Sequence, residues 1–219
     1  MVKITLKDVG KQYNSDWIFS NLSFSITPDS PTAILGSNGS GKSTLLQVIL
    51  SSITPTLGEI IYEENGSIVN VENAYRLMSI SAPYIELIEE FTLIEVIDFH
   101  RRLKPLYNNL TAMDVAGICQ LEKNSEKLIR NFSSGMKQRV KLALAILSDT
   151  PVLLLDEPTS NLDQAGIDWY IKLISQYQND RTIVVSSNSI ELEYNFCNQI
   201  IDLLKYKSIP ETDVSLLLF

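Results

Sequence analysis

One stretch of this 219-residue chain has residue types and spacing suited to holding phosphate. Gly36-Ser37-Asn38-Gly39-Ser40-Gly41-Lys42-Ser43 fits the pattern G-x-x-x-x-G-K-[ST]. We expect Gly36, Gly39 and Gly41 to adopt backbone angles that side chains forbid, so that successive N–H groups point at phosphate oxygens. Lys42 would then reach the β- and γ-phosphates, and the Ser43 hydroxyl would bind Mg²⁺. The stretch predicts a site for a nucleoside triphosphate.

The elements on either side of this loop are those that such a site requires. Thr32–Leu35 is a short apolar run, typical of a buried parallel strand. Residues 43–50 indicate a helix with Leu45, Leu46 and Ile49 facing inward. The positive N-terminal end of that helix would add to the attraction for an anion. A strand, a glycine-rich turn and a helix are together the context that the motif needs.

A pair of carboxylates follows a second apolar run. Asp156 and Glu157 come directly after Val152–Leu155, another expected buried strand. Ligands of open α/β sheets bind at the carboxyl ends of such strands. Asp156 is suited to binding Mg²⁺ through water, and Glu157 to orienting or deprotonating an attacking water. An ordinary solvated pair is the alternative, which Pro158 and the following Ser160-Asn161-Leu162-Asp163 disfavour.

A second motif lies far from the first. Phe132-Ser133-Ser134-Gly135-Met136 resembles the L-S-G-G-Q signature of ABC ATPases, and with the phosphate loop before it the chain resembles an ABC transporter nucleotide-binding subunit over nearly its whole length. Ser133 would begin a helix with Val140, Ala143, Leu144 and Leu147 on one face. The resemblance implies that this helix N-terminus contacts the γ-phosphate of ATP held by a second subunit, so that two chains clamp two ATP molecules.

The resemblance also assigns the remaining site residues. Tyr13 matches the aromatic residue that stacks on adenine, with Trp17 as the alternative; either could instead lie on the apolar face of a strand. The expected catalytic residues are Glu157 and Asn188, and the expected Mg²⁺ ligands are Ser43 and Asp156. The expected nucleotide contacts are Tyr13, Gly36, Ser37, Asn38, Gly39, Ser40, Gly41, Lys42, Ser43, Thr44, Ser133, Ser134 and Gly135.

Three positions depart from the family pattern. A Gln that binds Mg²⁺ falls near Ala82 or Pro83, a His that touches the γ-phosphate is replaced by Asn188, and Met136 stands for a Gln. An Asn side chain donates a hydrogen bond but carries neither a proton nor a positive charge. The residues for ATP binding are intact, so we expect ATP to bind. Because Glu157 remains, we expect hydrolysis to be slow and not absent.

These patterns predict an α/β fold: a P-loop NTPase core with a mostly parallel sheet, an N-terminal antiparallel β subdomain and an inserted helical subdomain. One ABC ATPase domain is expected over 1–219, with the core in 1–83 and 150–219 and the helices in about 84–149. Further expected elements are a hairpin around Glu64-Asn65-Gly66, a helix over Leu93–Leu103, and a helix over 164–177 with Ile167, Tyr170, Ile171 and Ile174 on its core side.

Composition excludes several classes of protein. A net charge of −8 argues against a nucleic-acid partner, which favours a basic surface. No apolar run approaches the about 18 residues that cross a bilayer, so transport would need separate permease subunits. Cys119 and Cys197 suit two free thiols in a reducing cytoplasm. We therefore expect a cytoplasmic protein held at the membrane by permeases. His100, the only His, rules out a His-based metal site and is expected on the surface or in a groove.

The leading hypothesis is a homodimeric ATPase that drives a transporter, with export favoured because Ser-Ser-Gly-Met-Lys-Gln-Arg resembles exporter signatures. The alternatives are a catalytically weak partner in a heterodimeric ABC ATPase, and a non-transport regulator. Glu86, Glu89, Glu90 and Glu95 suggest an acidic groove for a basic coupling helix of the permease, or else an ordinary solvated face.

Overall fold

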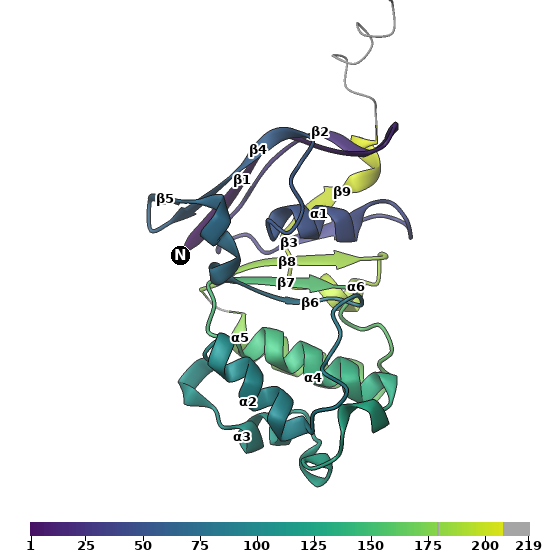
Figure 1. The fold of residues 1–219 in the computed structure, drawn as a ribbon. Helices are drawn as coiled ribbons and strands as arrows, with labels where there is room; N and C mark the ends of the chain where they lie inside the picture. Colours follow the sequence, from purple (N-terminus) through teal and green to yellow (C-terminus); the bar gives the residue numbers. More distant parts are fainter. Residues whose placement is uncertain (179, 208–219) are drawn as a thin grey trace, which may run out of the picture.

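A computed structural model describes residues 1–178 and 180–207, which form layers of sheets and helices (Figure 1). The C-terminal part of the predicted core, 208–219, lies outside the described residues. An antiparallel sheet of four strands has the order β2-β1-β4-β5. Its strands are β1 (Val2–Tyr13), β2 (Asp16–Ile26), β4 (Leu57–Glu64) and β5 (Ser67–Val69). The predicted hairpin joins β4 and β5, where Asn65 and Gly66 both have positive φ.

The second sheet is parallel and has the order β6-β7-β8-β3-β9. Its strands are β3 (Thr32–Leu35), β6 (Met78–Ser81), β7 (Val152–Asp156), β8 (Thr182–Ser187) and β9 (Gln199–Asp202). Strand β7 is buried on both faces: Leu153 and Leu155 pack among the helices, whereas Val152 and Leu154 pack toward the antiparallel sheet. That double burial explains its uninterrupted apolar sequence.

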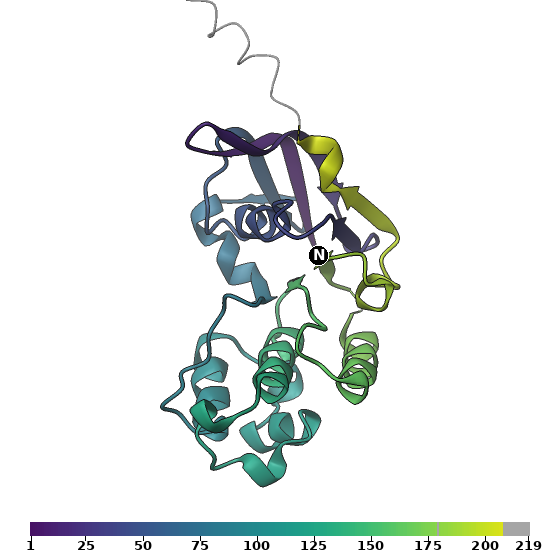
Figure 2. The same ribbon diagram turned by 90° about the vertical axis from the view of Figure 1, so that its right-hand side faces the viewer.

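Helices cover both faces of the parallel sheet (Figures 1 and 2). Helix α1 (Lys42–Ile49) lies between the two sheets, with Leu45, Leu46 and Ile49 fully buried as predicted. On the opposite face, α4 (Ser134–Leu147) and α5 (Gln164–Tyr177) lie next to the sheet, and α2 (Leu93–Leu103) and α3 (Ala112–Ile118) lie farther from it. The short α6 (Glu191–Tyr194) follows β8. The short 3₁₀ helices are η1 (Val71–Leu77), η2 (Tyr107–Asn109), η3 (Glu122–Asn124), η4 (Ile129–Asn131) and η5 (Leu203–Tyr206).

The core-facing side of α5 differs from the predicted one. Tyr170 and Ile174 are buried, but Ile167 and Ile171 are only half-buried. Trp169 and Leu173 take their place in the core. The reason is that α5 packs against α4 and also reaches the end of α3, where the Trp169 indole N–H donates to the Ile118 carbonyl at 2.7 Å. None of the helices in the described ranges is long and apolar enough to cross a bilayer.

Candidate nucleotide-binding and hydrolytic site

The phosphate loop joins β3 to α1, as predicted. Gly39 and Gly41 have φ of 74° and 105°, values that L side chains rarely adopt. Gly36 does not have a positive φ, so the predicted reason for this glycine is wrong. A Cβ at Gly36 would instead overlap the Ser40 hydroxyl. Glycine is therefore required at position 36 because there is no room for a side chain, and not because of the backbone angle.

Lys42 is buried, with 4% of its side chain exposed, and points back into the loop. Its Nζ donates to the carbonyl oxygens of Gly36 at 3.0 Å and Ser37 at 3.2 Å. It also donates to Asn188 Oδ1 and lies 3.7 Å from Glu157 Oε1. The ammonium is thus held where the loop would receive a phosphate, and a carboxylate stands beside it.

Asn188 connects the loop lysine to the expected base. Its Nδ2 donates to Glu157 Oε1 at 2.8 Å while its Oδ1 accepts from Lys42. Glu157 has a φ of 45°, an uncommon conformation for a residue with a side chain, and its N–H donates to the Ser186 carbonyl at 3.0 Å. The structure therefore brings together Lys42, Glu157 and Asn188, from three different parts of the sequence.

Asp156 lies beside this group and has one unused oxygen. The residue is 1% exposed, and its Oδ1 accepts a hydrogen bond from Ser186 Oγ. Its Oδ2 is buried and has no hydrogen-bond partner. A buried carboxylate oxygen without a donor fits a hydrated Mg²⁺ ion, which would satisfy it. In the described residues no cluster of three or more His, Cys, Asp and Glu forms a separate metal site.

A small pocket at the phosphate loop is lined by several of the predicted nucleotide contacts and by one residue, Ile18, that the sequence did not predict. Gly39, Gly41, Lys42, Ser43 and Thr44 line it together with Glu157 and Ile18. A Cβ on Gly41 would overlap the Ile18 side chain, so β2 closes directly onto the loop. The strand pattern of β2 carries no sign of this contact.

The two candidate adenine contacts lie near the turn between β1 and β2. Tyr13 is 44% exposed and has Lys11 Nζ 5.0 Å from its ring centroid, which leaves ring surface available for stacking. Trp17 is half-buried, and a Cβ on Gly10 would lie 3.0 Å from its ring. The exposure of Tyr13 agrees with the choice of Tyr13 over Trp17, and its contact with adenine stays a prediction.

The signature residues surround a different pocket. Ser133 caps α4, where its Oγ accepts from the Met136 N–H at 3.2 Å. The pocket is lined by Leu121, Ser133, Ser134, Gly135, Met136, Arg139, Asn161, Leu162 and Asp163. It shares no residue with the pocket at the phosphate loop. Gln138, buried in α4, ties this region to the hydrolytic one by donating to the Pro158 carbonyl at 2.9 Å.

Tyr84 follows the position of the missing Gln and was not singled out from the sequence. Burial and the negative charge of Asp156 raise the pKa of the Tyr84 hydroxyl to about 12, against a hydrogen bond with Gln47 that lowers it. Tyr84 is therefore close enough to α1 and to Asp156, the expected Mg²⁺ ligand, for both to affect its hydroxyl. An aromatic residue just after Pro83 was the only available signal.

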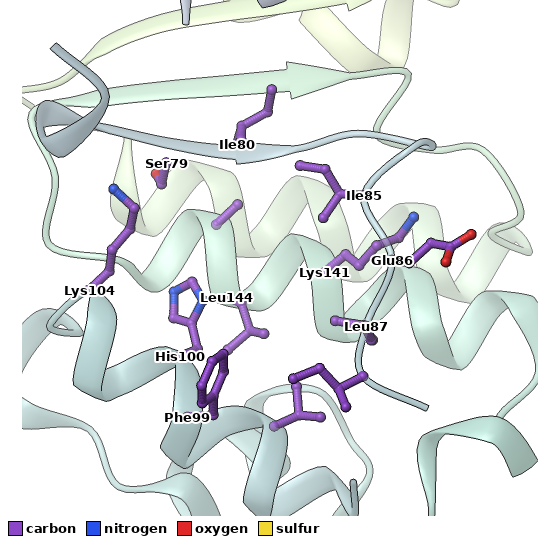
Figure 3. A pocket seen from close by; sticks show the side chains of 13 residues that line it. Ser79, Ile80, Ile85, Glu86, Leu87, Phe99, His100, Lys104, Lys141 and Leu144 are labelled. Carbon is purple, nitrogen blue, oxygen red and sulfur yellow. The ribbon is translucent and has the colours of Figure 1, made fainter. Parts of the chain in front are cut away.

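A groove between β6, α2 and α4 is lined mostly by apolar side chains (Figure 3). Lys104 lies at one end, and Lys141 and Glu86 lie at the other. Of the four acidic residues expected here, Glu86 lines this groove. Glu86 and Glu89 line the adjoining pocket with Lys137 and Lys141, and Glu95 takes part in the N-terminal cap of α2. An acidic groove for a coupling helix, or else an ordinary solvated face, therefore stays a prediction beside this apolar groove with charged ends.

His100 lies in this groove, as expected, and is held neutral. The Ser148 hydroxyl donates to the Leu144 carbonyl, so the Ser148 oxygen accepts from His100 Nε2 at 2.8 Å. Burial, with a smaller contribution from Lys104, lowers the pKa of His100 to about 4. Both cysteines have pKa values raised to about 12 by burial, which keeps them as thiols.

Several ABC transporter ATP-binding proteins are similar to this chain in sequence. The chain is 31% identical over 183 residues to the uncharacterized ABC transporter ATP-binding protein YcbN of Bacillus subtilis, a match over 81% of this chain and 59% of that protein. It is 30% identical to the zinc import ATP-binding protein ZnuC of Buchnera aphidicola, over 93% of this chain and 81% of that one. It is 28% identical to the Nod factor export ATP-binding protein I of Rhizobium johnstonii, over 96% and 69%.

Solved structures share the fold. A putative ABC transporter ATP-binding protein from Pyrococcus furiosus matches with a TM-score of 0.78 and 20% identity, over 94% of this chain and 100% of that one. A dimeric ATP-binding cassette bound to ADP and Pi matches with a TM-score of 0.76 and 23% identity, over 91% and 93%. The family model described as ABC transporter covers residues 19–160, and the chain therefore belongs to the ABC transporter family.

Proposed function

We propose that this chain is an ATP-binding and ATP-hydrolysing subunit that powers export of a substrate through separate permease subunits. The observation that carries the proposal is the arrangement of Lys42, Asn188 and Glu157, in which the loop lysine lies 3.7 Å from the expected base. ABC ATPases generally hydrolyse ATP, and a structural relative was solved with ADP and Pi.

In this proposal the residues at the loop divide the work of binding. Backbone N–H groups of 36–41 and the Lys42 ammonium hold the triphosphate. Ser43 and Asp156 hold Mg²⁺, and the unpartnered Asp156 Oδ2 supports that role. When bound, Mg²⁺ neutralises charge on the phosphates. Tyr13 stacks on adenine.

Hydrolysis would depend on Glu157 and Asn188. Phosphate binding gives Lys42 a stronger partner than the Asn188 amide, which frees that amide to donate to the γ-phosphate. Glu157 orients or deprotonates the attacking water. Because Asn188 cannot take up a proton, hydrolysis is slow but not absent.

The second subunit would be another copy of this chain. The signature pocket and the loop pocket are separate in one chain, so Ser133, Ser134 and Gly135 serve the nucleotide of the partner. ATP thereby closes a dimer, and hydrolysis reopens it. A solved relative is dimeric.

The apolar groove would receive an amphipathic helix of the permease, which places the chain on the cytoplasmic face of the membrane. An apolar centre with Lys104, Lys141 and Glu86 at its ends suits a helix that has an apolar stripe and charged flanks. The relatives include one named for import and one named for export, so export rests on the exporter-like signature. No nucleic-acid partner is proposed.

A second candidate function is a catalytically weak ATP-binding partner in a heterodimer. Asn188 and the absence of a Gln at Ala82 or Pro83 favour it. Turnover of ATP by the purified chain over a range of protein concentrations separates the two, with Glu157→Gln as the control. Activity per chain that rises with concentration and disappears in the control supports the homodimer. Mg-ATP binding without turnover supports the second candidate, and absence of ATP binding overturns both.

A further inference from the structure

Residues at the end of β8 form hydrogen bonds with several acidic side chains. Three consecutive residues each donate a hydrogen bond to a different carboxylate: Ser186 to Asp156, Ser187 to Glu193, and Asn188 to Glu157. Two of these carboxylates already have expected roles at the nucleotide. The third, Glu193 of α6, has none, although it belongs to the same row.

Glu193 joins two segments that are distant in sequence. Its Oε1 accepts from the Thr159 N–H at 3.0 Å and from Thr159 Oγ1 at 2.6 Å, and its Oε2 accepts from Ser187 Oγ. Thr159 lies two residues after Glu157, and Ser187 directly precedes Asn188. The Glu193 carboxylate therefore holds together the segment that follows Glu157 and the residue that precedes Asn188.

The burial of Glu193 argues against simple packing. The residue is 1% exposed, and in the described part of the chain no Lys, Arg or His forms an ion pair with it. Burying a charge is costly unless hydrogen bonds compensate, and an apolar side chain would fill the same space without that cost. The three donors from Thr159 and Ser187 are thus the feature that explains a carboxylate here.

We propose that Glu193 is a positioning residue for ATP hydrolysis, which holds Thr159 against Ser187 and so keeps Glu157 and the segment 160–163 in register with Asn188. The inference rests on the proposed function for its effect on turnover. The left-handed conformation of Glu157 supports it, because an unfavourable backbone conformation persists only where its surroundings fix it.

A second anchor of α6 supplies a matched control. The Tyr170 hydroxyl donates to the Glu193 backbone carbonyl at 3.0 Å and so holds the same short helix without touching the carboxylate. Tyr170→Phe removes that anchor and leaves the bonds to Thr159 and Ser187. Any effect of Glu193 that comes from loosening α6 should appear in this variant too.

The experiment compares kcat and the Kd for Mg-ATP in the full chain. Glu193→Ala is expected to lower kcat by about 10- to 100-fold with Kd changed by less than about twofold, because a catalytic group moves while the phosphate loop does not. Glu193→Gln keeps an oxygen for the Thr159 N–H and is expected to restore most of the rate. Tyr170→Phe should lower the melting temperature and leave kcat near wild type.

Unchanged kcat in Glu193→Ala, or an equal loss in Tyr170→Phe, would overturn the inference. If Glu193→Ala does not fold, Thr159→Val tests the same link by removing one of its hydrogen bonds, and an unaltered kcat there also overturns it. Amide hydrogen exchange of 157–163 without nucleotide separates this inference from the proposed function. If the wild type does not hydrolyse ATP, faster exchange in the Glu193 or Thr159 variant, absent in Tyr170→Phe, still supports the positioning role, and unchanged exchange rejects it.

Discussion

At the scale of single residues, Asn188 is the position on which the proposed chemistry most depends. Its amide accepts from Lys42 and donates to Glu157, so it bridges opposite charges that lie 3.7 Å apart. A neutral imidazole could form both bonds, but a protonated one has two donors and would oppose Lys42. The Asn188 amide therefore forms both bonds without a change of protonation, but it cannot exchange protons with the reacting groups.

We predict that Asn188→His raises kcat. Restoring a group that can donate and accept a proton should increase turnover by about tenfold, at the low end of the usual effect of a positioned acid or base. The rate should also become pH-dependent near the ordinary pKa of His, about 6.5. Steady-state ATP turnover between about pH 5.5 and 8.5 checks both effects.

The control for this substitution is Asn188→Ala, which removes the bridge and is expected to lower kcat below that of the wild type. An unchanged rate in Asn188→His would show that the Asn is not what limits hydrolysis. The residue-scale explanation of slow turnover would then pass to the missing Gln near Pro83.

At the scale of elements, the sequence predicted best what consecutive residues determine. The strand before the phosphate loop, α2 over Leu93–Leu103 and the cap of α4 at Ser133 follow from local patterns and agree with the structure. Glu193 was missed because its partner Thr159 is 34 positions away and no fixed spacing marks the pair. The space beside Gly36 was missed for a similar reason, since a motif shows which residue is required but not which contact requires it.

The face of α5 shows the same limit. A helical period selects several apolar stripes that overlap, and neighbouring elements decide among them. Trp169 lies in the core, where its indole N–H needs a hydrogen-bond partner. That partner, the Ile118 carbonyl at the end of α3, could be identified only from the tertiary structure.

Packing of α2 against α4 leads to a prediction on pH and stability. The pKa of His100 is lowered from 6.5 to about 4 in the folded chain, so the unfolded chain binds the proton more readily. The stabilisation is therefore complete above about pH 6.5 and is lost as the pH falls toward 4. One such group changes the free energy of unfolding by at most about 1.4 kcal/mol per pH unit.

Urea unfolding of the wild type and His100→Gln at several pH values measures this contribution. The carboxylates titrate in both proteins, so their effects cancel in the difference. We expect the advantage of the wild type over His100→Gln to shrink as the pH is lowered from about 6.5 to about 4. Parallel stability curves across that range would contradict a buried, neutral His100.

At the scale of the whole molecule, the groove and the hydrolytic site are joined by a short segment of chain. Lys141 of α4 donates to the Ala82 carbonyl at 3.2 Å, and Ile85 lines the groove. Between them, burial and the negative charge of Asp156 raise the pKa of the Tyr84 hydroxyl. Only a few residues thus separate the surface proposed for the permease from the carboxylate proposed for Mg²⁺. We therefore propose that the segment Ala82–Ile85 couples a helix bound in the groove to the residues expected to hold Mg²⁺.

This arrangement predicts that a charge placed in the groove weakens membrane attachment but leaves basal ATP turnover unchanged. Phe99 lies in the groove and is 44% exposed, so Phe99→Glu should cost little folding energy but oppose an apolar partner. A loss of about 1.4 kcal/mol in the free energy of binding to the permease would reduce the membrane-bound fraction about tenfold when binding is weak. The basal turnover of the purified chain should stay near wild type, because Phe99 does not line either of the pockets proposed to contact nucleotide.

Leu103→Glu is the matched control, because Leu103 lies on the same helix, is 67% exposed and does not line the groove. Fractionation of cells that carry each variant, with ATP turnover of each purified chain, makes the comparison. Loss from the membrane in Phe99→Glu but not in Leu103→Glu assigns attachment to the groove and not to the general charge of α2. Equal membrane fractions in all three proteins would instead mean that the permease holds the chain elsewhere, and the segment Ala82–Ile85 would then lose its proposed role in coupling.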